Sequence, residues 1–103
     1  MLYLMMCKNN GNKNLVKVGV TRQLSARRHQ YKSHNPYAIM RSSCAGTENQ
    51  EIKCHSMLLK MGKRVRGTEW FEVSDEVFQN IYKQGMKIFF PNHSPIYFDE
   101  EFD

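Results

Sequence analysis

Residues 2–7 read LYLMMC, an uninterrupted apolar run with the length of one β-strand. The polar stretch that follows contains Asn10-Gly11, a dipeptide typical of tight turns. Residues 15–20 then read LVKVGV, a second strand-length run rich in β-branched side chains. The two runs predict a β-hairpin at the start of the chain.

The segment after the hairpin predicts a helix followed by a third strand. Thr21 is a candidate N-cap, and residues 22–33 contain good helix formers without Pro or Gly. Leu24, Arg27 and Tyr31 recur at helical spacing, so we expect them on one face. Pro36 ends the helix, and residues 37–44 read YAIMRSSC, typical of a strand.

The second half of the chain predicts two more helices. Thr47 and Gln50 have the spacing of a capping box, and the helix they begin runs to about Met61. We expect a stripe of Ile52, His55 and Leu59 on this helix. A short extended segment follows at 69–73, then a helix capped by Ser74, then a short strand at 86–90. The inward side chains of the last helix are expected to be Val77, Phe78, Ile81 and Tyr82.

The order of these segments predicts one α/β (α+β) domain over residues 1–103. Consecutive strands that pair as hairpins give a small, mainly antiparallel central sheet, here of about three strands flanked by helices. We treat residues 74–103 as an acidic C-terminal extension. Its last five residues, 99–103, are expected to be mobile because they are polar and terminal.

Bulk composition excludes several classes of protein. The 103 residues are 41% hydrophobic and 24% charged, which is ordinary for one globular domain and unlike a disordered chain. No apolar run approaches the roughly 20 residues of a membrane span, and the N-terminus lacks the pattern of a signal peptide. Cys7, Cys44 and Cys54 lack metal-type spacing, which favours reduced thiols. We therefore expect an intracellular protein, cytoplasmic or nuclear, that is not secreted.

Charge is distributed unevenly along the chain. Residues 1–68 carry thirteen Lys and Arg against two acids, a net charge of +11. Residues 69–103 carry two Lys against eight acids, a net charge of −6. A positive field over most of a small domain attracts polyanions such as nucleic-acid backbones, although a solvated basic face without a partner is the plainer alternative.

Several polar side chains fall on faces that otherwise look buried. Tyr3 lies in the first strand, and Arg27 and Tyr31 share a helix face. Glu51 and His55 are four residues apart, so they project together from the next long helix. A carboxylate can hold a divalent cation, an arginine can bind a phosphate, and Tyr or His can transfer protons. Each residue also has a structural alternative: an Arg–Glu ion pair, a core histidine, or packing tyrosines.

The spacing of these residues resembles the signature of the GIY-YIG endonuclease superfamily. The parallels are the stretches LYL at 2–4 and KVG at 17–19, then Arg27 eight positions after Gly19, then Glu51. Residues 16–28, with KVGVT at 17–21, resemble a short branch associated with phages and bacteria. In that branch a Glu, three residues and a His precede a Gly-Glu-Trp-Phe stretch, similar to residues 51–55 and 67–71 here. The resemblance covers about residues 2–73.

The resemblance implies a metal-dependent DNA endonuclease with roles for particular residues. Tyr3 would position or activate the attacking water, Arg27 would bind the scissile phosphate, and Glu51 would hold one Mg²⁺ or Mn²⁺. Tyr31 or His55 would assist proton transfer. Two departures stand out: no Gly precedes the first motif, and Lys17 replaces the Tyr of the second.

Lys17 can take the role of that Tyr as a proton acceptor only if its pKa is lowered; otherwise it is a phosphate clamp. DNA is the expected partner, in a phage, viral or mobile-element setting. RNA, a second copy of the chain and a partner protein are the alternatives, and no membrane is expected. Two other functions stay open: a nucleic-acid binder without activity, and a protein-interaction factor. The expected backbone contacts are Lys13, Arg22, Arg28, Lys32, Lys53, Arg64 and Arg66.

Overall fold

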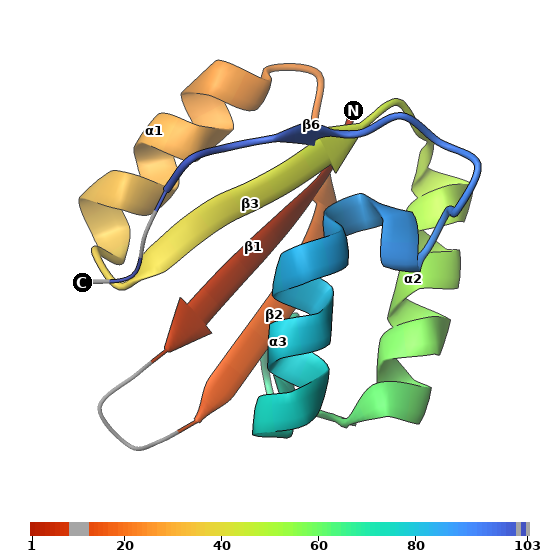
Figure 1. The fold of residues 1–103 in the computed structure, drawn as a ribbon. Coiled ribbons are helices and arrows are strands. Elements are labelled where there is room, and N and C mark those ends of the chain that lie inside the picture. Colours follow the sequence, from red (N-terminus) through yellow and green to blue (C-terminus); the bar gives the residue numbers. More distant parts are fainter. Residues whose placement is uncertain (9–12, 101, 103) are drawn as a thin grey trace.

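The computed structural model describes residues 1–8, 13–100 and 102 (Figure 1). The predicted Asn10-Gly11 turn lies outside these residues. The elements follow the chain as β1 (Leu2–Lys8), β2 (Asn14–Val20), α1 (Leu24–His34), β3 (Ala38–Cys44), α2 (Glu48–Met61), β4 (Lys63–Arg64), β5 (Phe71–Val73), α3 (Asp75–Gln84), the 3₁₀ helix η1 (Gly85–Ile88) and β6 (Ile96–Tyr97).

The strands form one antiparallel sheet in the order β4-β5-β2-β1-β3-β6. The predicted hairpin is confirmed, with Leu2 opposite Val20 and Lys8 opposite Asn14. The α+β class is confirmed, but the number of strands is wrong: the sheet has six strands, not about three. The additional strands contain only two or three residues, too few to show the alternation by which a strand is recognised in a sequence.

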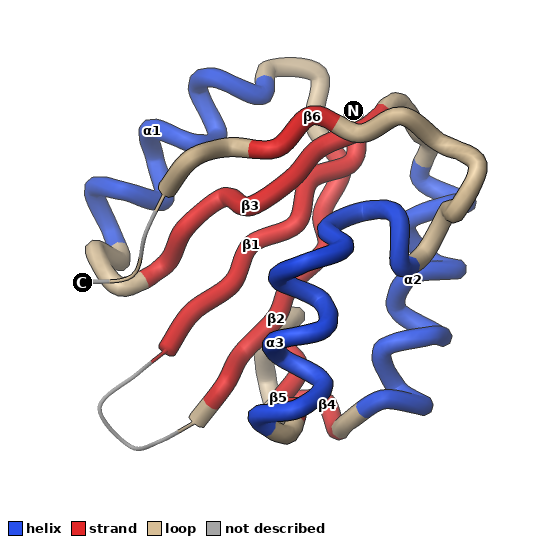
Figure 2. Tube along the Cα trace, viewed as in Figure 1, coloured by secondary structure: helices blue, strands red, loops and turns tan. Residues whose placement is uncertain are grey.

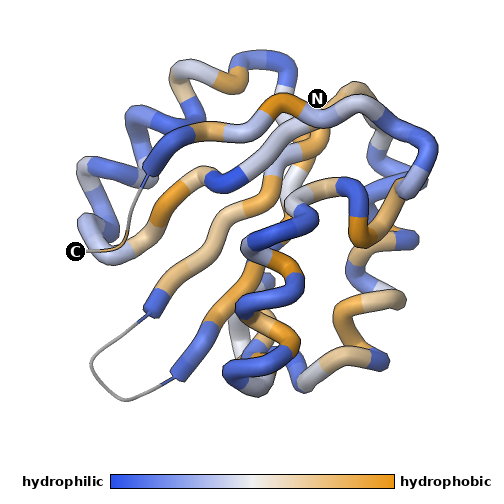
Figure 3. The backbone as a smooth tube through the Cα atoms, in the orientation of Figure 1, coloured by the Kyte–Doolittle hydropathy of each residue, from blue (hydrophilic) through white to orange (hydrophobic). Residues whose placement is uncertain are grey.

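Helices cover both faces of the sheet (Figure 2). On one face the side chains of Leu2, Leu4 and Met6 pack with buried residues of α2 and α3. On the other face Tyr3, Met5 and Cys7 pack with Leu24 and Tyr31 of α1. The central strand β1 is therefore apolar on both sides, because successive side chains of a strand point to opposite faces. Figure 3 shows hydrophobic residues concentrated in the strands and α1 mostly hydrophilic.

The observed start of α1 and the observed inward face of α2 differ from the predictions. The N-cap of α1 is Gln23 rather than Thr21, whose hydroxyl accepts a hydrogen bond from the Gln23 amide. The capping box of Thr47 and Gln50 is confirmed.

The predicted stripe on α2 is wrong, because Ile52 and Leu59 are 60% and 57% exposed. The inward residues are instead Cys54, Met57, Leu58 and Met61, which follow the i, i+3, i+4, i+7 spacing of one helix face.

Two predictions for the C-terminal third are also corrected. Residues 86–90 do not form a strand, because Gly85 adopts a φ of 59° and the chain continues into η1. The Met86 amide then donates to the buried Ser42 hydroxyl.

The segment expected to be mobile packs against the fold in its described part. The Glu100 carboxylate accepts a hydrogen bond from the Met40 amide, and the centroid of the Phe102 ring lies 5.6 Å from that of Phe78. Residues 101 and 103 lie outside the described residues.

None of the described helices is long and apolar enough to cross a membrane. The three cysteines are free and buried, and burial raises the pKa of each thiol, that of Cys54 to about 12. A thiol that stays protonated is a poor nucleophile, so the cysteines act here as small packing groups.

Neighbouring leucines on α2 test the observed orientation of that helix. Leu58 is fully buried and Leu59 is 57% exposed. We expect Leu58→Ala to lower the free energy of unfolding by about 2–5 kcal/mol, since it leaves a cavity in the core. Leu59→Ala should change it by about 0.5 kcal/mol or less, as is usual on a surface. Urea denaturation of both variants makes the comparison, and a larger loss for Leu59→Ala would contradict this orientation of α2.

Candidate active site

The candidate site begins with the phenol ring of Tyr3, which lies over the neighbouring strand of the hairpin. Tyr3 on β1 is paired with Gly19 on β2. A Cβ atom at position 19 would lie 2.3 Å from the Tyr3 hydroxyl oxygen, far inside contact distance. Gly19 therefore lets the Tyr3 ring lie over β2, because any side chain there would displace it.

Beside this ring lies a group of four side chains that we call the Lys17 cluster: Tyr3, Lys17, Tyr31 and Glu69. The Lys17 ammonium donates a hydrogen bond to the Tyr31 hydroxyl and lies 3.1 Å from a Glu69 carboxylate oxygen. The Tyr3 and Tyr31 rings are 6.2 Å apart at their centroids, and their hydroxyls are hydrogen-bonded. The cluster joins β1, β2, α1 and the loop before β5.

The electrostatics of the cluster keep Lys17 charged and Tyr3 neutral. Burial by itself would lower the pKa of Lys17, but the hydrogen bond to Tyr31 and the ion pair with Glu69 outweigh it and raise that pKa. Burial and the bond to Tyr31 raise the pKa of Tyr3, although the Arg27 cation acts in the opposite direction. Lys17 is thus suited to attracting an anion rather than accepting a proton, and Tyr3 keeps its hydroxyl hydrogen at neutral pH.

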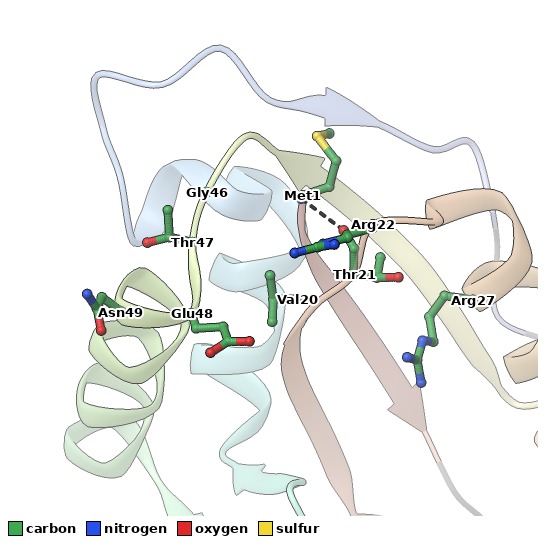
Figure 4. Close-up of a pocket in the computed structure, with 9 residues that line it drawn as sticks. All are labelled: Met1, Val20, Thr21, Arg22, Arg27, Gly46, Thr47, Glu48 and Asn49. Atoms are coloured by element: carbon green, nitrogen blue, oxygen red, sulfur yellow. Dashed lines mark hydrogen bonds between the residues drawn. The ribbon is translucent and has the colours of Figure 1, made fainter.

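Arg27 faces a cavity at the open end of the hairpin, where β1 begins and β2 ends. The cavity has a volume of about 630 Å³, and Figure 4 shows its lining residues from the β2–α1 connection and from the start of α2. Arg27 and Glu48 approach it from opposite sides, and Arg22 lies between them (Figure 4). Among the described residues the Arg27 guanidinium has no hydrogen-bond or ion-pair partner. An unpaired guanidinium in an open hollow is available to a phosphate.

Glu51 and His55 occupy the side of α2 that faces β2. The His55 Nε2 atom lies 2.9 Å from the Val18 carbonyl oxygen, which only accepts hydrogen bonds. Nε2 must therefore carry the hydrogen, and in the neutral ring Nδ1 has the free lone pair. Glu51 is one turn earlier on the same side of the helix, so it lies toward the end of β2 where the cavity opens. Its carboxylate is half-buried and has no hydrogen-bond or ion-pair partner in the described part of the chain.

The structure brings most of the predicted site residues to one end of the hairpin, in two groups. Tyr3, Lys17 and Tyr31 are in direct contact, and Arg27 is close enough to influence Tyr3 electrostatically. Glu51 and His55 approach the other edge of β2 from α2. The expected common hollow is lined by Arg27 and by Glu48 rather than by Glu51, which is one helical turn away.

Two carboxylates near the site were not singled out from the sequence. Glu69 pairs with Lys17 across 52 positions of the chain, which no local pattern predicts. The one available signal was its place in the GTEWF stretch at 67–71. Glu48 is the first residue of α2, where the helix dipole alone is enough to favour an acidic side chain. Its position in the sequence therefore did not predict that it lines the cavity.

The cations expected to contact nucleic acid fall into two groups. Arg22, Lys53, Arg64 and Arg66 are exposed, and Arg22 lines the cavity beside Arg27. Lys13, the residue before β2, is also exposed. Arg28 and Lys32 are instead paired with the carboxylate of Glu100. Arg22, Lys53 and Arg66 have no ion-pair partner among the described residues and are available to a polyanion, whereas Arg28 and Lys32 must first lose Glu100.

A family model supports a nucleic-acid-related role. The T5orf172 domain model matches residues 1–85, so the chain belongs to the T5orf172 domain family. This domain is found in phage and mobile-element proteins and is often nuclease-like. The matched region extends from β1 to the end of α3 and contains the whole candidate site. No curated protein and no solved structure matches the chain.

Titration of Glu69 tests the Lys17 cluster. The hydrogen bond and charge of Lys17 hold the pKa of Glu69 below its ordinary value, and His55 and Arg64 contribute less. The stabilisation from this pair is therefore complete above the ordinary carboxyl pKa and is lost as the pH falls through the lowered one. We expect Lys17→Met to raise the pKa of Glu69 toward the ordinary range, and Arg64→Met to raise it less.

Carbon-13 NMR of the Glu69 carboxyl in the wild type and the two variants gives the three pKa values. Each variant removes one cation, so the comparison separates direct contact from net charge. Equal shifts in the two variants would show that Lys17 and Glu69 do not form a specific pair.

Proposed function

We propose that this protein is a metal-dependent DNA endonuclease with a GIY-YIG-like site, of phage, viral or mobile-element type. The observation that carries the proposal is a pair of ionic groups without a partner among the described residues: Arg27 on α1, which lines the cavity, and Glu51 on α2, one helical turn after the cavity residue Glu48. Charged groups that are half-buried without a protein partner are costly unless they serve a ligand. A phosphodiester with a bound cation satisfies both.

The cationic groups would hold the scissile phosphate. Arg27 offers a planar fork of N–H donors to the nonbridging oxygens, whose negative charge grows in the transition state. Lys17 remains an ammonium within the cluster and supplies a second positive charge, as a clamp. The net charge of +11 over residues 1–68 would draw the DNA backbone toward this side of the chain.

Tyr3, His55 and Tyr31 would position the water and transfer protons. Tyr3 keeps its hydroxyl hydrogen and can orient a water by a hydrogen bond, but it is not a base at neutral pH. Hydrolysis requires the water to lose a proton as its oxygen bonds to phosphorus, while the P–O bond to the leaving group breaks and that oxygen is protonated. Nδ1 of His55 has a free lone pair for the first transfer. Tyr31, which receives a hydrogen bond from Lys17, is the phenol on the α1 side for the second.

The residues present fit a Mg²⁺ ion, or Mn²⁺, held mainly by its substrate. Among the described residues there is no group of three or more metal-ligating side chains. Mg²⁺ is commonly bound through one or two carboxylates together with waters and substrate phosphates, which the half-buried Glu51 suits. Such an ion polarises the phosphate and stabilises the leaving oxygen when bound. Glu48, one turn away in the cavity with Arg27, is the second carboxylate within reach of the same region.

A second candidate function is nucleic-acid binding without cleavage, and it is favoured by the charge of Lys17. The ammonium replaces a tyrosine that the GIY-YIG superfamily retains, and its raised pKa makes it a clamp rather than a base. For a binder we expect affinity for a labelled duplex to fall steeply between 50 and 200 mM salt, by about a thousandfold or more if six or more phosphates are contacted. The duplex should stay intact when Mg²⁺ or Mn²⁺ is added. Cleavage by the wild type under those conditions would reject this alternative.

Alanine variants of the two ionic groups test the endonuclease proposal. We expect Arg27→Ala and Glu51→Ala each to slow DNA cleavage at least about a hundredfold, since each removes charge stabilisation from the transition state. The measurement is single-turnover cleavage of plasmid and duplex DNA with Mg²⁺ or Mn²⁺. Circular dichroism and urea denaturation check that the fold is retained.

The matched controls are Lys83→Ala and Glu76→Ala, which remove one exposed charge of each sign from α3. Both should cleave like the wild type. Full activity of Arg27→Ala or Glu51→Ala would refute the assignment of that residue. Loss of activity in the controls as well would point to net charge rather than to this site.

A further inference from the structure

The carboxylate of Glu100 is held by an unusually complete set of donors. One oxygen accepts a hydrogen bond from Arg28 Nε at 2.6 Å, and it lies 2.5 Å from Arg28 Nη2 and 3.1 Å from Lys32 Nζ. The other oxygen accepts from the backbone amide of Met40 at 3.0 Å. The Glu100 side chain is only 9% exposed. We call the three donor residues, Arg28, Lys32 and Met40, the anion cradle.

The anion cradle has the chemistry of a phosphate site. A guanidinium fork, an ammonium and a backbone N–H are the groups that proteins use to bind phosphate oxygens. Burial would raise the pKa of Glu100, but the bonds from Arg28, Met40 and Lys32 outweigh it and lower that pKa. Glu100 is therefore ionised at neutral pH and carries a single negative charge, the same charge as one phosphodiester.

The residue that fills the cradle belongs to a part of the chain outside the matched family domain. That match ends at residue 85, whereas both cations of the cradle lie inside it, on α1. The segment that delivers Glu100 joins the sheet through β6, an edge strand of two residues whose side chains are both exposed. The Arg28 guanidinium stacks on the Phe98 ring, with its Cζ atom 4.6 Å from the ring centroid.

The cradle also borders open space that a larger anion can enter. A shallow pocket on α1 is lined by Ser25, Arg28, His29 and Lys32. Arg28 and Lys32 thus face both the Glu100 carboxylate and this pocket. A phosphate that displaced the carboxylate would keep the same cations and gain room for the rest of its backbone.

We propose that the anion cradle is a second binding site for the phosphodiester backbone, and that Glu100 is its built-in competitor. This inference rests on the proposed nucleic-acid function. Binding of DNA at the cradle requires the carboxylate to leave, so Glu100 weakens the affinity of the wild type for DNA. The C-terminal segment then limits nonspecific binding by a domain whose first 68 residues carry a net charge of +11.

Charge-neutral amides at positions 99 and 100 test the competition. Glu100→Gln and Asp99→Asn each raise the net charge by one, but Asp99 is exposed and has no hydrogen-bond or ion-pair partner among the described residues. The affinity for a labelled duplex is measured by fluorescence anisotropy in EDTA, so that cleavage does not intervene. We expect Glu100→Gln to bind about tenfold more tightly than Asp99→Asn, the size of one charged hydrogen bond. Adding Arg28→Ala and Lys32→Ala to Glu100→Gln should remove this gain.

The outcomes separate this inference from the proposed function. If the wild type binds DNA and the two amide variants bind equally, the cradle is purely structural and the inference is overturned. If no variant binds DNA at low salt, the nucleic-acid function fails as well.

A measurement on the wild type covers the case in which Glu100→Gln does not fold. Duplex should move the NMR resonances of the Glu100 carboxyl and the Met40 amide as the bond between them breaks. Saturating duplex that leaves both resonances unchanged would overturn the competition.

Discussion

The arrangement of the site depends on the close approach of the Tyr3 ring to Gly19. This cross-strand pair requires the observed register of β1 and β2, since a slip of one residue would place a side chain under the ring and send Tyr3 to the opposite face. In that register Lys17 lies on the α1 side and meets Tyr31, while Val16 and Val18 enter the core under α2. The same alternation that builds the core therefore also builds the Lys17 cluster.

Features with a local signal could be predicted from the sequence. The hairpin followed from two apolar runs, α2 from its capping box, and the α1 face from the spacing of Leu24 and Tyr31. Features that depend on distant contacts could not. The short edge strands form because they pair with neighbouring strands, and they are too short to show a repeating hydrophobic pattern. The prediction for the inward face of α2 was wrong because Ile52 and Leu59 are apolar but exposed. The contact of Lys17 with Glu69 and that of Arg28 with Glu100 join residues 52 and 72 positions apart.

The basic charge of the first 68 residues is divided between two uses. Arg22 and Arg27 face the cavity at the end of the hairpin, where no described carboxylate pairs with them. Arg28, the next residue after Arg27, points to the other side of α1 and is neutralised by Glu100. A rotation of about 100° per residue is enough to separate these roles on one helix. Glu100 thus reduces the positive charge of α1 on the side away from the cavity, whereas Arg22 and Arg27 keep their charge at the cavity.

In the proposed endonuclease, a divalent cation and a phosphate meet between α2 and the open end of the hairpin. The most direct measurement is the paramagnetic broadening of amide resonances by Mn²⁺, recorded with and without a short duplex. We expect broadening centred on the first two turns of α2 around Glu51 and on the adjoining end of β2, and stronger broadening in the presence of DNA. Broadening confined to the acids of β5 and α3, with the resonances around Glu51 unaffected, would contradict this expectation.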